Sequence, residues 1–255
     1  MSIGYAASFA GVYSVGLIVN QGVPILLAVL IAILVGAMVG FINGLIVTKL
    51  GVNALIATLG TGTIIVGVNY AYSGGIPISG LAEYPMFTNM AQGKFLGMPL
   101  TIIYMICIVA ILWIILNRTV LGQHIQAVGG NARASELSGV KIDRVRVVAF
   151  VISGLCAAIG GILLASRIGS GQVTGGDGYL MQSFAAVFLG SAALRDGEFH
   201  ILGTLIGVLT VGVGFNGIAI LGAPTYVQFV FQGALLVAAV ALSTTARRLA
   251  ATSSL

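Results

Sequence analysis

The chain has 255 residues, of which 58% are hydrophobic and only 7% are charged. Soluble globular domains carry about 25% charged residues, so this composition excludes a water-soluble monomer. It equally excludes a disordered chain, which combines low hydrophobicity with high charge. The net charge is +5, but the basic residues gather at the ends of apolar stretches, which indicates membrane orientation and not nucleic-acid binding. The composition predicts a polytopic helical membrane protein.

Uncharged stretches long enough to cross a bilayer follow one another along nearly the whole chain. A membrane helix needs about 20 apolar residues, and turn signals at 20–24 and 221–225 divide the two longest stretches. We therefore predict an all-α membrane bundle of about eight elements, organised as a single transmembrane domain over 1–255. The elements are predicted over 3–19, 25–47, 53–73, 98–116, 146–166, 179–194, 201–220 and 226–245.

A short basic loop predicts the orientation of the bundle. The loop over 117–146 holds five of the eleven basic residues, so the positive-inside rule places it in the cytoplasm. Counting backward puts Lys49 in the cytoplasm and 74–97 outside. Counting forward, the C-terminus and Arg195 are cytoplasmic if 179–194 crosses the membrane and external if that segment is re-entrant; the charge rule favours crossing. The five residues are Arg118, Arg133, Lys141, Arg144 and Arg146.

Patterns that indicate catalysis are missing from the sequence. It has no phosphate-binding Gly-x-x-x-x-Gly-Lys-Ser/Thr motif, and His124 and His200 lie too far apart in sequence to suggest a metal site. The Gly-x-Gly-x-x-Gly match at 212–217 has no preceding strand, which favours helix packing over dinucleotide binding. No acidic residue lies deep in a predicted span, which argues against a charge-driven carrier. We predict no catalytic residue, metal or cofactor.

Small and uncharged polar residues dominate the predicted spans. Gly36, Gly40 and Gly44, and later Gly203 and Gly207, recur at four-residue spacing, which predicts close helix contacts. Amides and hydroxyls suit a neutral, hydroxyl-rich solute, although hydrogen bonds between helices explain at least half of them. The candidate residues of a translocation path are Asn43, Thr58, Thr61, Asn69, Gln182 and Asn216.

A short amphipathic helix is predicted inside the basic loop. Asn131 is a favourable N-cap and Gly139 a favourable C-terminal stop. Arg133 and Glu136 are three residues apart and can pair on one face. This helix can serve as a simple connector or as a docking element for a cytoplasmic partner, and these residues alone favour neither.

The same loop resembles a known signature. Residues 127–131 and 137–140 resemble the coupling-helix motif of the permease subunits of sugar-type ABC importers, the ribose, xylose, galactose and autoinducer-2 group. Further stretches resemble this family in the same order, so the resemblance covers essentially the whole chain. They are 41–47, 58–61, 165–167, 178–179, 185–190, 202–207 and 216–217.

The resemblance implies a non-catalytic permease of the inner membrane that translocates a sugar or similar neutral polyol. It implies a second permease subunit, a cytoplasmic ATPase subunit and a periplasmic sugar-binding protein as partners, within membrane lipid and without nucleic acid. The alternative is an ion- or proton-coupled secondary carrier of a small polar solute. The residues expected to couple to the ATPase are Asn131, Arg133, Ala134, Glu136, Leu137, Ser138 and Gly139.

Two features differ from the pattern of the family. Family members usually have an acidic residue where Arg133 stands and a basic one where Glu136 stands, so we expect an ATPase groove of correspondingly altered charge. Residues 1–4 resemble the latter part of an internal Asp-Leu-Ser-Ile-Gly stretch that follows two membrane segments. We therefore expect a permease that is shortened at its N-terminus.

Overall fold

The computed structural model describes residues 1–194 and 198–253. Arg195, whose side of the membrane we predicted, lies outside the described residues, as do the side chains of Arg247 and Arg248. The internal contacts of the chain define two compact units, Met1–Asp177 and Gly178–Leu255.

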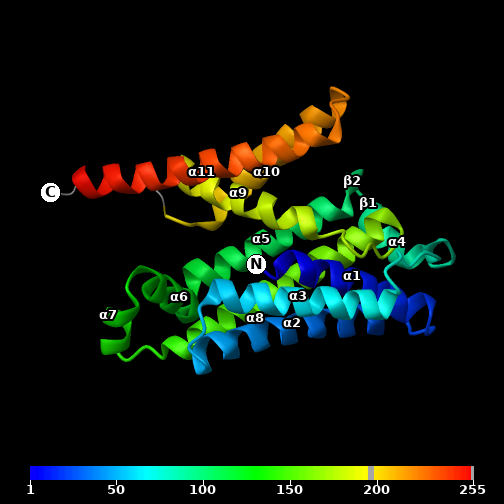
Figure 1. Cartoon of the computed structure of the whole chain (residues 1–255), viewed down its shortest axis with the longest axis horizontal. Coiled ribbons are helices and arrows are strands. Elements are labelled where there is room, and N and C mark those ends of the chain that lie inside the picture. Colours follow the sequence, from blue (N-terminus) through cyan, green and yellow to red (C-terminus); the bar gives the residue numbers. More distant parts are fainter. Residues whose placement is uncertain (195–197, 254–255) are drawn as a thin grey trace. The chain divides into compact units, whose positions relative to one another are not determined.

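The first unit consists of helices with a small hairpin (Figure 1). Its long helices are α1 (Ile3–Val19), α2 (Ile25–Lys49), α3 (Ala54–Ser73), α5 (Leu100–Arg118) and α8 (Ile142–Ile168). Between α3 and α5 come the 3-10 helix η1 (Leu81–Glu83), α4 (Pro85–Gln92) and the strands β1 (Lys94–Phe95) and β2 (Met98–Pro99), which pair antiparallel. Between α5 and α8 come α6 (Val120–Gly130) and α7 (Ala132–Leu137).

The predicted all-α fold is confirmed, with one correction to the basic loop. Within the described residues, six helices are long and apolar enough to cross a membrane: α2, α3, α5, α8, and α10 and α11 of the second unit. Helix α1 is a shorter apolar helix of 17 residues. The loop predicted over 117–146 is mostly helical, and Arg144 and Arg146 lie in the first turns of α8 because that helix already begins at Ile142.

Close contacts between helix backbones hold α1, α2 and α8 together. A Cβ on Gly36 would lie 2.7 Å from the carbonyl oxygen of Gly154, and one on Gly44 would lie 2.8 Å from Cα of Val147. These contacts confirm the close packing predicted for α2. The opposite face of α2 exposes large apolar side chains, as expected of a lipid-facing helix, since lipid offers no hydrophobic drive to bury them. These residues are Leu26, Leu30, Leu34 and Met38.

Helix α4 closes one end of the first unit. Phe87 is fully buried among residues of α1, α2 and α8. Ser166 of α8 donates a hydrogen bond of 2.6 Å to the carbonyl of Phe87 and accepts one of 3.0 Å from the backbone N–H of Ala91. The segment between α3 and α5, which we predicted only as a connection outside the membrane over 74–97, is therefore an ordered cap.

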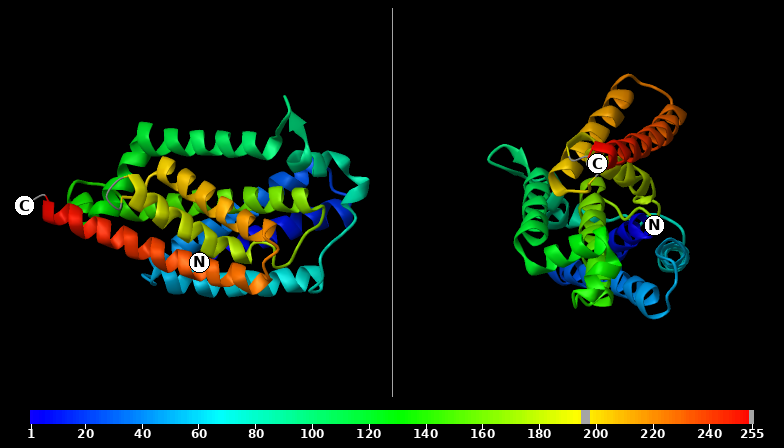
Figure 2. Two further views of the ribbon diagram at one scale, coloured as in Figure 1. Left: turned by 90° about the horizontal axis from the view of Figure 1, so that it is seen from above. Right: turned by 90° about the vertical axis from the view of Figure 1, so that its left-hand side faces the viewer.

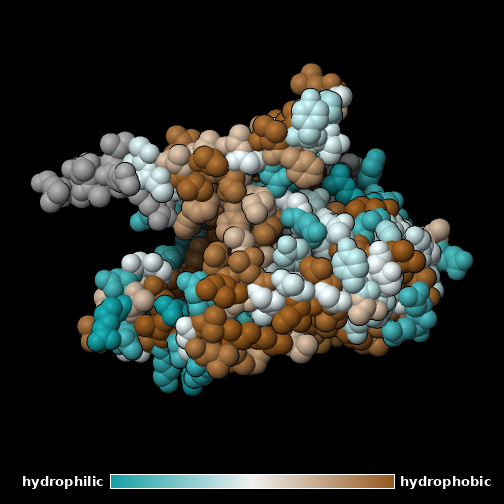
Figure 3. Space-filling view, in the orientation of Figure 1, coloured by the Kyte–Doolittle hydropathy of each residue, from teal (hydrophilic) through white to brown (hydrophobic). Residues whose placement is uncertain are grey.

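The two ends of the first unit carry different structures. Helices α6 and α7 lie at one end, and α4 with the β1–β2 hairpin lies at the other, as the views in Figures 1 and 2 agree. On the face of this unit drawn in Figure 3, brown apolar residues lie between teal hydrophilic residues at both ends. This separation matches the prediction that 74–97 and the basic loop face opposite sides of a membrane.

The second unit contains α9 (Asp177–Leu194, which starts at the border), α10 (Ile201–Ile220) and α11 (Thr225–Ser253). Helices α9 and α10 touch through small residues, since a Cβ on Gly207 would lie 2.7 Å from the carbonyl carbon of Ala186. Ser191 of α9 and Ser243 of α11 share a buried hydrogen bond of 2.8 Å. The glycine-rich stretch 212–217 lies inside α10, as predicted, but only Gly214 supports helix packing: a Cβ there would meet the ring of Phe231 in α11, whereas one on Gly212 or Gly217 would meet nothing within 4 Å.

Candidate functional site

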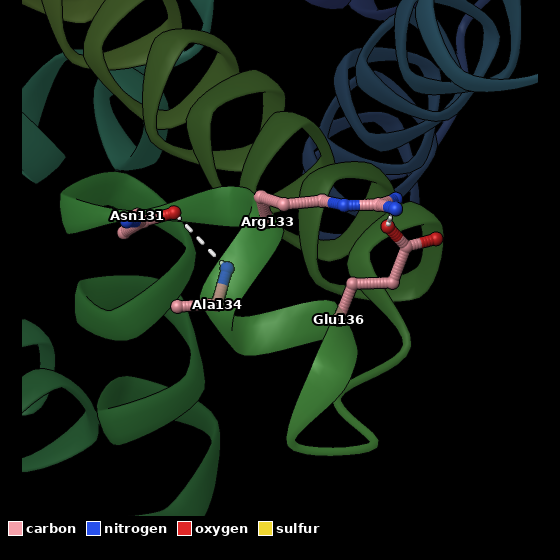
Figure 4. A network of polar contacts seen from close by, with 4 residues as sticks. All are labelled: Asn131, Arg133, Ala134 and Glu136. Atoms are coloured by element: carbon pink, nitrogen blue, oxygen red, sulfur yellow. Dashed lines mark hydrogen bonds and ion pairs between the residues drawn. The ribbon is translucent and has the colours of Figure 1, made fainter.

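Helix α7 is the short helix predicted inside the basic loop, and a polar cap fixes its start. The Asn131 side-chain oxygen accepts a 3.0 Å hydrogen bond from the backbone N–H of Ala134 (Figure 4). Such a cap satisfies one of the N–H groups that the first turn leaves without a partner, and it is worth about 1 kcal/mol. The predicted N-cap is confirmed.

The end of α7 is equally well defined. Gly139 has a φ of 83°, a conformation that glycine adopts without steric cost. The N–H of Gly139 donates to the carbonyl of Glu136, and the N–H of Val140 donates to that of Ser135. These two bonds form a Schellman motif, which turns the chain sharply from α7 toward α8. Ser138 adds a side-chain hydrogen bond of 3.0 Å to the carbonyl of Ala134.

Helix α7 displays charged and apolar groups to the surroundings. Arg133 and Glu136 form an ion pair of 3.0 Å, and their side chains are 79% and 57% exposed; in Figure 4 they point toward each other along one face of α7. An exposed pair of this kind stabilises a helix by only about 0.3–0.5 kcal/mol. Leu137 is 78% exposed. This six-residue helix is therefore capped at both ends, and its exposed side chains, Arg133, Glu136 and Leu137, are accessible to a partner.

Three of the six residues predicted for the translocation path lie together. The Asn43 amide donates to the Ser2 hydroxyl at 3.0 Å and accepts from the Thr61 hydroxyl at 2.6 Å. Thr58 lies one turn before Thr61 on α3 and accepts a hydrogen bond from the Met1 amino group at 3.1 Å. These contacts link α2 and α3 with the residues that precede α1. They are hydrogen bonds between segments of the bundle, the alternative role that we gave these polar residues besides lining a translocation path.

A small cavity of about 60 Å³ adjoins this cluster. Ser2, Asn43, Thr58 and Ser153 are among the residues that line it. A single water needs roughly 10–15 Å³ by this kind of measure, so the cavity has room for a few waters and not for a sugar. The described conformation of the first unit is therefore closed around these polar groups.

The other three path residues lie elsewhere. Asn69 is buried in α3, where its amide donates to the carbonyl of Val173 at 3.0 Å and its Oδ1 has no hydrogen-bond partner among the described residues. Gln182 is half-buried on α9 and Asn216 is exposed on α10, both in the second unit. The structure thus joins Asn43, Thr58 and Thr61 and does not gather all six.

Comparison with known proteins decides the family. Residues 1–240 match a family model described as "Branched-chain amino acid transport system / permease component". The chain belongs to this permease family. The match extends over both compact units, from α1 to residue 240 within α11.

Among the relatives of this permease are three sugar permeases. It is 40% identical to the ribose import permease protein RbsC of Bacillus subtilis (strain 168), over 95% of this chain and 75% of the relative. It is 35% identical to the L-arabinose transport system permease protein AraH of Escherichia coli (strain K12), over 94% of this chain and 72% of the relative. The D-allose transport system permease protein AlsC of the same strain is 32% identical, over 95% of this chain and 74% of the relative. No solved structure matches.

Sequence reasoning missed the support beneath α7. In this permease Thr119 is the N-cap of α6, and its hydroxyl accepts a hydrogen bond from the N–H of Gly122 at 3.2 Å. Gln126 donates to the carbonyl of Leu116 at 2.9 Å and so ties α6 back to α5. A threonine followed by 11 residues without proline is the signal that could have revealed this helix.

A second ion pair marks the same end of the permease. Lys49 at the end of α2 lies 3.9 Å from Asp143 in the first turn of α8. This contact places the end of α2 beside the segment that carries α6 and α7, as the helix count predicted. Two basic residues of the first unit, Lys94 and Arg167, belong to the end closed by α4. The other six lie at the α6–α7 end: Lys49, Arg118, Arg133, Lys141, Arg144 and Arg146.

Proposed function

We propose that this permease is the translocation subunit of an ATP-driven importer for a sugar or a similar neutral polyol. The observation that carries the proposal is α7, a helix capped at both ends that exposes Arg133, Glu136 and Leu137 at the basic end of the first unit. A short rigid helix of this kind can receive force from a partner without unfolding. The family match over residues 1–240 supports treating 1–255 as one permease domain.

A cytoplasmic ATPase subunit is the proposed partner of α7. Binding of ATP would close the ATPase, move α7 and α6, and through the Schellman turn at Gly139 transmit the movement to α8. Since α8 is packed backbone to backbone against α1 and α2, a shift of α8 would carry these helices with it. In this scheme the permease contributes movement and a path, and the ATPase performs the hydrolysis.

The proposed solute is a sugar, on the strength of the ribose, arabinose and allose permeases among the relatives. Neutral amide and hydroxyl groups, as at Asn43, Thr58 and Asn69, can exchange hydrogen bonds with sugar hydroxyls. We propose that these groups, with Thr61, Gln182 and Asn216, come to line a path when the closed conformation opens. A periplasmic binding protein would deliver the sugar.

The proposed orientation places the basic end in the cytoplasm. Six cations at the α6–α7 end against two at the α4 end follow the positive-inside rule. The α4 cap and the β1–β2 hairpin then face the binding protein. A crossing of α9 places the C-terminus in the cytoplasm. Helix α5, of which no residue is buried, is available to lipid and to a second permease subunit.

A cross-linking experiment tests the docking of α7. In a variant whose two native cysteines, Cys107 and Cys156, are replaced, a Leu137→Cys permease labelled with a maleimide–benzophenone reagent should photo-cross-link to the cognate ATPase subunit. Met86→Cys is the matched control, because Met86 is 69% exposed but belongs to α4 at the opposite end. A cross-link through residue 86, or equal yields at both positions, would contradict docking at α7.

A further inference from the structure

A pocket of about 340 Å³ lies beside α7, between α6 and the first turns of α8. Its polar groups are all basic or potentially basic: His124 of α6, Lys141 before α8 and Arg144 within α8. Its apolar lining comes from the same two helices and includes Leu121, Val145 and Val148. The pocket lies wholly within the first unit, and α7 leads into it through Gly139 and Val140.

The cations of this pocket have no acidic partner within the described residues. The two ion pairs found there join Lys49 to Asp143 and Arg133 to Glu136. Asp143, the carboxylate nearest in sequence to Arg144, is thus paired with a different cation. Since Lys141 and Arg144 are exposed and unpaired, the pocket presents uncompensated positive charge, which attracts an anion.

The pocket lies at the depth expected of lipid headgroups. Helix α5 ends at Arg118 and α8 begins at Ile142, and both are membrane-length apolar helices. The segment from α6 to Lys141 therefore lies where these spans leave the hydrocarbon core. Val145 and Val148 continue from the charged rim into the apolar part of α8, which provides a surface for an acyl chain. Inorganic phosphate has no apolar group that could pack against this lining.

We propose that this pocket binds an anionic phospholipid. The phosphate would lie between Lys141 and Arg144 with His124 beside it, and an acyl chain would lie along Leu121, Val145 and Val148. Basic pockets at the cytoplasmic ends of membrane helices hold anionic headgroups by this combination of charge and apolar contact. A bound lipid would join α6 to the start of α8 on either side of α7. The site requires only that the chain spans a membrane, so it is independent of the proposed transport.

Native mass spectrometry of the purified chain tests this proposal. Delipidated permease is titrated with dihexanoyl phosphatidylglycerol and dihexanoyl phosphatidylcholine. We expect preferential binding of phosphatidylglycerol, weakened at least tenfold in the double variant Lys141→Gln/Arg144→Gln. Arg146→Gln is the matched control for the single variant Arg144→Gln, because each removes one positive charge from the start of α8 and only Arg144 lines the pocket. Arg144→Gln should weaken binding, whereas Arg146→Gln should bind as the unmodified chain does.

Any one of four results would overturn the lipid site. The first is that the double variant binds phosphatidylglycerol as tightly as the unmodified chain does. The second is that Arg146→Gln weakens binding as much as Arg144→Gln does. The third is that inorganic phosphate displaces bound phosphatidylglycerol as effectively as added short-chain phosphatidylglycerol does, which would assign the pocket to a free anion. This measurement uses the unmodified chain and does not depend on folding of a variant. The fourth is that the double variant loses affinity for the ATPase subunit but still binds the lipid, which would assign the pocket to the protein partner.

Discussion

Glycines in α8 determine how closely the helices of the first unit approach. Gly154 faces α2 and Gly161 faces α1, and a Cβ on either would meet backbone atoms of the neighbouring helix, which cannot move aside as a flexible side chain can. Gly160, next to Gly161, has no other atom within 4 Å of a Cβ placed on it. Adjacent glycines in one helix therefore have opposite roles.

The two adjacent glycines allow a matched test of this packing. In Gly161→Ala, the new Cβ would lie 2.6 Å from the carbonyl carbon and 2.8 Å from Cα of Ala7. Overpacking of this kind costs about 1–3 kcal/mol, so the melting temperature in detergent should fall. Gly160→Ala should leave stability unchanged or raise it slightly, because alanine favours the helix. Equal effects of the two substitutions would show that α1 and α8 are not packed as described.

Polar residues of the spans show what sequence can and cannot predict at this scale. Asn43, Thr58 and Thr61 were predictable as polar groups inside apolar helices. Their partners were not predictable: Asn43 contacts Thr61 and Ser2, whereas Asn69 contacts the carbonyl of Val173. These partners depend on how each helix is rotated about its axis. The hydrophobic pattern barely sets this rotation in a membrane, because apolar residues surround these helices on all sides.

At the scale of elements, helix positions were largely predictable and short helices less so. The predicted segments 3–19 and 201–220 coincide with α1 and α10, because charges and turn residues mark their limits. Helix α7 was predictable from its caps. Helix α6 and the α4 cap were not predicted, although the sequence holds a start signal for each: Thr119 caps α6, and Pro85 begins α4 at a position where proline is favourable.

The polarity of the α7 ion pair leads to a prediction about the ATPase partner. Exchanging the pair by Arg133→Glu/Glu136→Arg retains an ion pair on α7 but reverses its direction toward the partner. Because like charges placed together across an interface cost several kcal/mol, we expect at least a tenfold rise in the permease concentration needed to stimulate ATP hydrolysis. Steady-state ATPase assays with the cognate subunit measure this.

The control for this exchange is Lys49→Asp/Asp143→Lys, which reverses the other exposed pair at the same end outside α7. It should leave the stimulation of ATP hydrolysis nearly unchanged. If the α7 exchange has no effect either, the charge of the ATPase groove is not matched to Arg133 and Glu136, and that hypothesis fails.

At the scale of the whole molecule, the permease combines three features that suit a driven translocation subunit. Its membrane helices expose apolar surface to lipid and contact one another through small residues. Its polar interior groups are neutral and closed off in the described conformation. Its α7 end presents a rigid helix beside a concentration of positive charge. A carrier that draws energy from an ion gradient would not need the docking role that we propose for α7.

Sugar uptake into proteoliposomes tests the central claim most directly. Vesicles would contain the permease with its ATPase subunit, ATP inside and the binding protein outside, and labelled ribose would be the first substrate because a ribose permease is among the relatives. The account predicts uptake that requires internal ATP and the ATPase subunit and that persists when ionophores collapse ion gradients. Uptake that proceeds without ATP and stops when the gradients collapse would contradict it.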